Sequence, residues 1–280
     1  MPRGRRVAHS VGVAGFALLL AALFGYGGVC LWFVEHERGL VFQPMQRRSL
    51  SPIAAGLKGV AEVTIATADG ERLYGWWTPP PAGHGAILVL TGKGVVISDY
   101  AGLYRDLAAH GFGVLGIDYR GNGASTGSPS QLGLREDARA AFEFVHAAAP
   151  RAKIAVFGAS LGTWPAIAVA VDRPAAGVLL NSPYASVRRL FELRGWPLPY
   201  RLLMADPLDS AALIGRLHVP VMILHGTADR AIPIAEARRL YEAAHQPKEM
   251  IEIAGAAHAD VWVGAARQRA LAALAQWTAP

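Results

Sequence analysis

The chain has 280 residues, of which 52% are hydrophobic and 17% charged, and its formal net charge is +6 at neutral pH. This length corresponds to one or two domains, and so apolar a composition excludes an intrinsically disordered chain. A single cysteine, Cys30, excludes a disulfide framework and a cysteine-rich metal site. Apart from Arg3, Arg5 and Arg6, the basic residues are scattered among acidic ones and form no stripe, so no nucleic-acid partner is expected.

The N-terminal segment has the length and composition of a membrane-spanning helix. Residues 11–34 are 24 consecutive residues without a charge. As a helix they would extend about 36 Å, whereas the hydrocarbon core of a bilayer is about 30 Å thick. Arginines precede this stretch, so the positive-inside tendency predicts a single-pass membrane protein with a cytoplasmic N-terminus and an exported, extracytoplasmic remainder.

We therefore expect a signal anchor in residues 1–37 and one further domain in residues 38–280. The alternative is a cleaved signal peptide, for which Gly25-Tyr26-Gly27 offers a small-x-small cleavage site. Cys30 is interpreted as an apolar residue of the helix.

Two alternating stretches follow a connector that contains prolines and covers residues 35–60. Residues 62–67 and 73–78 alternate between apolar and polar, and Asp69-Gly70 between them is a strong hairpin signal. The sequence therefore predicts an antiparallel hairpin ahead of the main domain.

From residue 86 the pattern changes to short apolar runs separated by stretches with helical periodicity. Continuous Val, Ile and Leu runs indicate strands buried on both faces, and hence an α/β fold with a mostly parallel sheet between helices. The runs are residues 86–90, 113–117, 153–157, 177–180, 221–224 and 250–253, and the helical stretches lie near 98–110, 131–148, 161–172, 232–245 and 260–277. Residues 182–216 show little long-range period, and we interpret them as an inserted small cap.

The pentapeptide Gly158-Ala159-Ser160-Leu161-Gly162 matches the pattern G-x-S-x-G. A predicted strand leads directly into it and a predicted helix leads directly out. In that setting a sharp turn raises the serine hydroxyl above the sheet, and the start of the helix offers a backbone N–H to a developing oxyanion. Ser160 is therefore the candidate nucleophile.

A serine nucleophile needs a base, and the base needs a carboxylate that orients it. Asp229 follows the predicted strand 221–224, and His258 follows the predicted strand 250–253. All three candidates thus lie at the carboxyl ends of strands, where such sheets place their sites. His225, at a strand end, is interpreted instead as a packed, hydrogen-bonded histidine.

Together these motifs resemble the α/β-hydrolase superfamily over nearly all of residues 60–280. The chain is most similar to membrane-anchored serine hydrolases of the serine aminopeptidase-like and lysophospholipase-like branch. The matching segments are TADG at 67–70, LYGWW at 73–77, DYRGNGAS at 118–125, GASLG at 158–162, HGTAD at 225–229 and, after the anchor, LVFQP at 40–44. The resemblance implies Ser160 as nucleophile, Asp229 as orienting residue and His258 as base, and an oxyanion hole made by the backbone N–H groups of Lys93 and Leu161.

The sequence departs from the family pattern after its first core strand. The family usually has His-Gly-Asn/Gly-Gly-like residues there, whereas this chain has Thr91-Gly92-Lys93-Gly94. The oxyanion hole still fits, because it requires only a backbone N–H. The Lys93 side chain either favours an acidic or phosphate-bearing substrate or is a solvated surface lysine.

The expected function is a membrane-anchored serine hydrolase that cleaves carboxylic esters, lipid acyl esters among them, through an acyl-enzyme. Trp164, after the pentapeptide, and Trp196, in the cap, are the expected substrate-binding residues. The expected partners are a small-molecule or lipid acyl substrate and the membrane. No cofactor and no metal are expected, because Ser/His/Asp chemistry needs none.

Two alternatives stay open at this point. The first is a serine amidase or aminopeptidase-like peptidase, for which Glu192, Asp206 and Asp209 are available to bind a free amino group. The second is a non-catalytic membrane scaffold on a hydrolase fold. Neither the substrate's identity nor the oligomeric state follows from the sequence.

Overall fold

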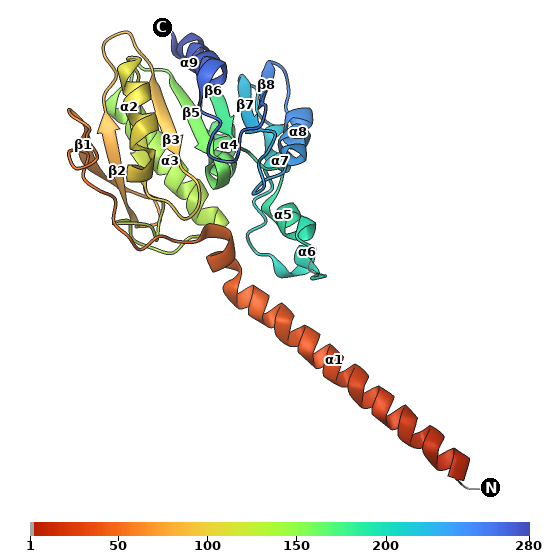
Figure 1. Cartoon of the computed structure of the whole chain (residues 1–280). Helices are drawn as coiled ribbons and strands as arrows, with labels where there is room; N and C mark the ends of the chain where they lie inside the picture. Colours follow the sequence, from red (N-terminus) through yellow and green to blue (C-terminus); the bar gives the residue numbers. More distant parts are fainter. Residues whose placement is uncertain (1–2, 196) are drawn as a thin grey trace.

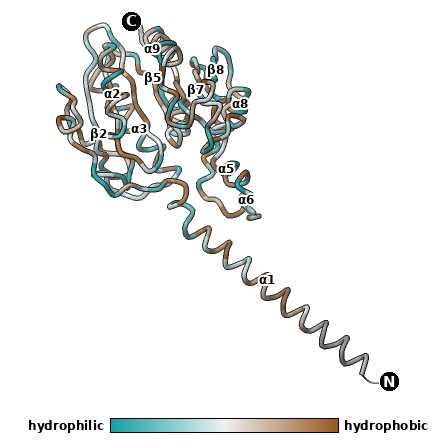
Figure 2. Tube along the Cα trace, viewed as in Figure 1, coloured by the Kyte–Doolittle hydropathy of each residue, from teal (hydrophilic) through white to brown (hydrophobic). Residues whose placement is uncertain are grey.

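A long helix, α1 (Arg3–Phe42), begins the chain and runs into the domain without a break. The structure, a computed structural model, describes residues 3–195 and 197–280. Figure 1 shows α1 extending away from the domain on the side opposite the C-terminus. Its segment Ala14–Phe42 is long and apolar enough to cross a membrane, and Figure 2 shows this apolar stretch along the tube. Residues 35–42, predicted as part of a connector, continue the helix.

An eight-stranded sheet in the order β1-β2-β4-β3-β5-β6-β7-β8 forms the centre of the domain. β1 and β2 pair antiparallel, as do β2 and β4, whereas every other neighbouring pair is parallel. The predicted hairpin and the mostly parallel sheet are therefore confirmed. The strands are β1 (Ala61–Ala66), β2 (Arg72–Thr78), β3 (Ala86–Leu90), β4 (Gly113–Ile117), β5 (Ile154–Ala159), β6 (Gly177–Asn181), β7 (Val221–Gly226) and β8 (Lys248–Ile253).

Helices cover both faces of the sheet, as expected for a sheet whose central strands are apolar on both sides. α3 (Gln131–Ala148), α4 (Thr163–Asp172) and α8 (Ile234–Ala243) pack on one face. α2 (Ala101–Ala109) and α9 (Gly264–Thr278) pack on the other. All residues of β3 and β4 are buried, and each buried Leu or Ile side chain contributes about 1.5–3 kcal/mol to folding.

The segment predicted as a cap insertion contains three short helices, α5 (Val187–Leu193), α6 (Tyr200–Leu203) and α7 (Ser210–Ile214). α7 packs against α4 and α8 and so is part of the body of the domain. α5 and α6 lie instead on the side of the domain from which α1 leaves (Figure 1). We call α5 and α6 the cap. The division of the chain at residues 37 and 38 and the extent of the insertion stay predictions.

Candidate active site

Ser160 occupies a sharp turn between β5 and α4. Its φ is 50°, in the left-handed region that side chains rarely adopt. A Cβ atom at Gly162 would lie 2.1 Å from the carbonyl oxygen of Leu90, and one at Gly158 would lie 2.6 Å from the Cβ atom of Ala166. The two glycines therefore allow the close backbone approach that this strained turn requires. This requirement explains the glycines at the first and last positions of the pentapeptide.

The three residues expected to act together are within hydrogen-bonding distance of one another. Nε2 of His258 lies 3.0 Å from Oγ of Ser160, and Nδ1 of His258 lies 2.6 Å from Oδ2 of Asp229. The loops after β5, β7 and β8 carry these residues to one edge of the sheet. The Asp229 side chain is fully buried, whereas the His258 side chain is 32% exposed and faces the cavity described below.

The environment of Asp229 keeps its carboxylate ionised. Burial alone would raise the pKa of Asp229, but hydrogen bonds from His258 and from the backbone N–H groups of Ile232 and Ala231 outweigh it and lower the pKa below its ordinary value. Both N–H groups donate to Oδ1, at 2.9 and 2.8 Å. Oδ2 therefore stays available to accept from Nδ1 of His258, which leaves Nε2 as the acceptor that faces Ser160.

His225 is a packed histidine, in agreement with the interpretation from sequence. It is fully buried, and its Nε2 donates to the carbonyl oxygen of Ile232 at 2.9 Å. Burial lowers the pKa of His225, so the ring is neutral at physiological pH. Its Nε2 also lies 3.4 Å from Oδ2 of Asp229, so the neutral ring forms one wall of the carboxylate site.

Ser182 is a site residue that the sequence analysis missed. It follows β6 directly, and its hydroxyl donates to the backbone carbonyl of His258 at 2.9 Å. Its φ of 49° is also in the left-handed region. Its position in the sequence could have identified Ser182 as a site residue, because it is a polar residue at the carboxyl end of a core strand, like the other candidates.

The two residues expected to form the oxyanion hole lie on the same cavity as Ser160. Leu161 follows Ser160 in the short 3-10 helix that leads into α4. The loop before Lys93 lies against Ser160, since a Cβ atom at Gly92 would be 3.4 Å from Cβ of Ser160. The Lys93 backbone N–H donates to no acceptor within residues 3–195 and 197–280, so it can donate a hydrogen bond to a bound substrate.

A cavity of about 700 Å³ opens over Ser160. This volume is typical of a small-molecule site. Its lining is largely apolar and includes residues from α1 and from the cap as well as from the sheet loops. The contributions of α1 are Leu40 and Val41, and the apolar contributions of α5 are Val187, Leu190 and Phe191.

Three charged side chains line this cavity: those of Lys93, Asp99 and Arg194. Asp99 is neutralised by Arg47, whose guanidinium nitrogen lies 2.7 Å from its carboxylate. Lys93 and Arg194 form no ion pair within the part of the chain that the structure describes. Burial, together with the positive charge of Arg194, lowers the pKa of Lys93. The cavity therefore has an excess of positive charge.

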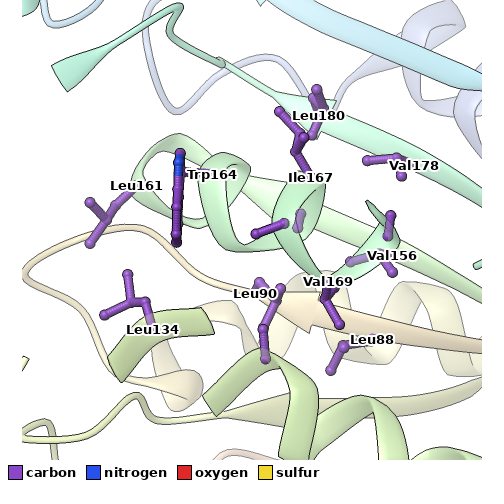
Figure 3. Close-up of a cluster of buried hydrophobic side chains, with 14 of the residues drawn as sticks. Leu88, Leu90, Leu134, Val156, Leu161, Trp164, Ile167, Val169, Val178 and Leu180 are labelled. Carbon is purple, nitrogen blue, oxygen red and sulfur yellow. The ribbon is translucent and has the colours of Figure 1, made fainter. Parts of the chain in front are cut away.

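Trp164 is not part of the cavity, and this placement corrects the expectation that it contacts substrate. Its side chain is 3% exposed and belongs to the hydrophobic core. Figure 3 shows Trp164 near Leu161 and above Leu90 and Leu134. The first turn of α4 thus directs this side chain into the core. Trp196, the other expected substrate contact, lies outside the described residues.

The acidic residues considered for an amino-group site do not line the cavity either. Asp206 is buried, pairs with Arg38 at 3.0 Å and accepts a backbone N–H. Asp209 caps α7, and Glu192 lies 3.8 Å from Arg188. Among the described residues, no three His, Cys, Asp or Glu side chains form a group that would hold a metal ion.

Comparison with known proteins places the chain in a family. The uncharacterized protein Rv2307c of Mycobacterium tuberculosis is 35% identical over 240 residues, which are 83% of this chain and 84% of that protein. The family model described as "Serine aminopeptidase, S33" matches residues 81–211. The chain belongs to the α/β-hydrolase superfamily. The α/β hydrolase domain-containing protein aho-3 of Caenorhabditis elegans is 31% identical over 67% of this chain and 56% of its own length.

Solved structures show the same α/β-hydrolase fold. The esterase Pf2001 of Pyrococcus furiosus superposes with a TM-score of 0.66 at 18% identity, over 84% of this chain and 96% of the esterase. The acetyl xylan esterase of Paenibacillus sp. R4 superposes with a TM-score of 0.65 at 19% identity, over 79% of this chain and 85% of that enzyme. At such identities the likeness concerns the fold.

Proposed function

We propose that this α/β hydrolase is a serine hydrolase that cleaves carboxylic esters, with lipid acyl esters among its substrates. The observation that carries the proposal is the continuous hydrogen-bonded chain from Oγ of Ser160 through His258 to Asp229, with distances of 3.0 and 2.6 Å. In this arrangement Ser160 is the nucleophile and His258 the general base. Asp229 orients the imidazole ring and stabilises the positive charge of the imidazolium that forms.

The reaction follows from this geometry. Nε2 of His258 takes the hydroxyl proton while Oγ of Ser160 attacks the ester carbonyl carbon, and the backbone N–H groups of Lys93 and Leu161 stabilise the oxyanion. The intermediate collapses, the C–O bond to the alcohol breaks, and the alcohol leaves with the proton from His258. Water then attacks the acyl-enzyme by the same route and releases the acid and free Ser160. Each oxyanion donor is worth about 10²–10³ in kcat.

The charge of the cavity supports ester rather than aminopeptidase chemistry. A substrate with a free ammonium group would need an unpaired acidic partner, whereas the cavity presents Lys93 and Arg194, and its Asp99 is paired with Arg47. The apolar lining from α1 and α5 suits an acyl chain. These features favour acyl esters over amides of amino acids.

We propose further that α1 is a signal anchor, with the hydrolase domain on the exported side of the membrane. Its length and apolar composition support this. Cleavage after Gly27 would leave Val29, Leu31 and Trp32 in water, and these side chains are 43%, 68% and 44% exposed in the structure. A retained helix places them in lipid instead, which is the lower free energy for apolar surface.

The test is labelling by a fluorophosphonate probe of detergent-solubilised full-length protein, followed by hydrolysis assays of matched esters and amides. We expect the wild type to be labelled and Ser160→Ala to remain unlabelled. The matched control is Ser128→Ala, because Ser128 is exposed and lies outside the cavity. Labelling that persists in Ser160→Ala, or a folded wild type that is never labelled, contradicts the proposal.

A further inference from the structure

The anchor helix and the cap pack together through an aromatic cluster. Phe33 of α1 is only 1% exposed. Its ring meets the ring of Phe191 edge-on at 5.6 Å between centroids and that of Tyr200 at 5.3 Å. Such aromatic contacts stabilise beyond the area that they bury, so α1 and the two cap helices are held in one arrangement.

Polar contacts strengthen this arrangement at the end of α1. The Glu37 side chain is buried, and its carboxylate accepts the backbone N–H groups of Ala205 at 3.0 Å and of Asp206 at 2.8 Å. The neighbouring Arg38 pairs with the Asp206 carboxylate at 3.0 Å. The chain that follows α6 is therefore fixed to the last turns of the anchor.

A third contact lies nearer the N-terminus of α1, within the uncharged stretch of that helix. The hydroxyl of Tyr26 donates to the carbonyl oxygen of Pro197, between α5 and α6, at 2.7 Å. Tyr26 precedes Val34, the last uncharged residue of the stretch, by eight positions, which is about 12 Å along a helix. The whole stretch exceeds the hydrocarbon thickness by only about 6 Å. Tyr26 therefore lies within the bilayer's apolar depth, and the cap segment bonded to it reaches the same level.

The cap has exposed apolar side chains of the kind that this location requires. Leu202 on α6 is 85% exposed and Leu193 on α5 is 51% exposed. Arg194 and Arg201 are exposed beside them, and long cationic side chains extend to the headgroup level when their stems lie in lipid. Interfacial segments combine exposed leucines with Lys and Arg side chains in this way.

We propose that the cap lies in the interfacial layer of the phospholipid bilayer, with Leu193 and Leu202 in contact with acyl chains. Because α1 and α5 both line the cavity above Ser160, an acyl ester then enters the cavity between these two helices directly from the membrane. The proposal rests on the anchoring function of α1 proposed above. The bilayer is thus the partner of this surface as well as the source of substrate.

The chain's single cysteine makes a site-specific test direct. In a Cys30→Ala background, the variants Leu202→Cys, Leu23→Cys and Gln276→Cys each carry one NBD fluorophore, and the full-length protein is reconstituted in phosphatidylcholine–phosphatidylglycerol vesicles with or without doxyl-labelled lipid. Leu23 is 58% exposed on α1 and reports the anchor. Gln276 is exposed near the end of α9, on the side of the domain opposite α1 (Figure 1), and is the matched control.

We expect doxyl lipid to quench the probes at positions 23 and 202 at least twofold, and to leave the probe at position 276 within a few per cent of its emission. Quenching at position 23 without quenching at position 202 overturns the cap proposal and leaves the anchor in place. Absence of quenching at both positions shows that the anchoring itself fails. Fluorophosphonate labelling of Ser160 in the same samples separates these results from a failure of the serine hydrolase mechanism, and Leu193→Cys replaces Leu202→Cys if the latter does not fold.

Discussion

The hydroxyl of Ser182 donates a hydrogen bond to the backbone carbonyl of His258 at 2.9 Å. Ser182 follows β6, whereas His258 follows β8, and β7 lies between these two strands in the sheet. The bond therefore fixes the loop that carries the proposed base to the body of the domain. The ring is then constrained from two sides, by this backbone contact and by the Asp229 carboxylate.

Removal of this hydroxyl provides a first prediction. Ser182→Ala leaves the His258 carbonyl without its donor and costs one hydrogen bond, about 1 kcal/mol. We expect kcat for a soluble ester to fall about fivefold with a smaller change in KM, because the lost bond positions the His258 loop and Ser182 is only one of the residues that line the cavity. Ester hydrolysis kinetics measure this, with Ser128→Ala as the matched control. Equal kcat values for Ser182→Ala and wild type would show that the loop is held without this bond.

Replacing the buried carboxylate by its amide tests the orientation of the base. In Asp229→Asn, Oδ1 still accepts from Ala231 and Ile232, but no charge remains to favour the imidazolium and the Nδ1–H tautomer of His258 is lost. We expect kcat to fall by about 10³–10⁴. Steady-state kinetics and the rate of fluorophosphonate labelling measure the loss. A fall of less than tenfold would mean that another acceptor orients His258.

The two cations of the cavity predict a preference among esters. Lys93→Gln removes one positive charge but keeps the backbone N–H that is proposed for the oxyanion hole. We expect KM for an ester with a carboxylate or phosphate group to rise about tenfold, which corresponds to about 1.4 kcal/mol, while KM for a neutral ester of the same acyl chain is unchanged. Parallel assays of the two esters measure this. An equal change for both esters assigns the Lys93 side chain to structure rather than to substrate selection.

The parts of the fold that sequence patterns predicted are those decided by local burial. Core strands such as β3 are apolar on both faces because helices cover both, and the amphipathic stretch 131–148 coincides with α3. Likewise, Ser160, Asp229 and His258 each follow a strand, and the parallel arrangement of β5, β7 and β8 brings them to one edge of the sheet.

Features that depend on contacts between distant segments of the chain could not be predicted from local sequence patterns. The charges of residues 35–38 suggested that the first helix ends there, but Glu37 is buried against backbone N–H groups some 168 residues away and the helix continues to Phe42. Trp164 follows Ser160 closely in sequence, yet the direction of the first turn of α4 places it in the core. The role of Ser182 likewise depends on a contact across the sheet edge.

A buried carboxyl outside the active site makes stability depend on pH. Asp118 is 1% exposed, and burial raises its pKa to about 6 although Ile97 N–H and the Ser49 hydroxyl donate to it. Between about pH 3.9, the ordinary pKa of an aspartate, and about pH 6, the folded chain keeps a proton that the unfolded chain releases. The contribution of Asp118 to the free energy of unfolding therefore falls as pH rises, by at most about 3 kcal/mol.

Asp118→Asn does not titrate, so its stability relative to wild type should increase from pH 4.5 to pH 7. Urea unfolding in detergent, followed by tryptophan fluorescence, measures this difference, with the exposed Asp260→Asn as control. A difference that stays constant across this range would show that Asp118 is already ionised in the folded protein at pH 4.5.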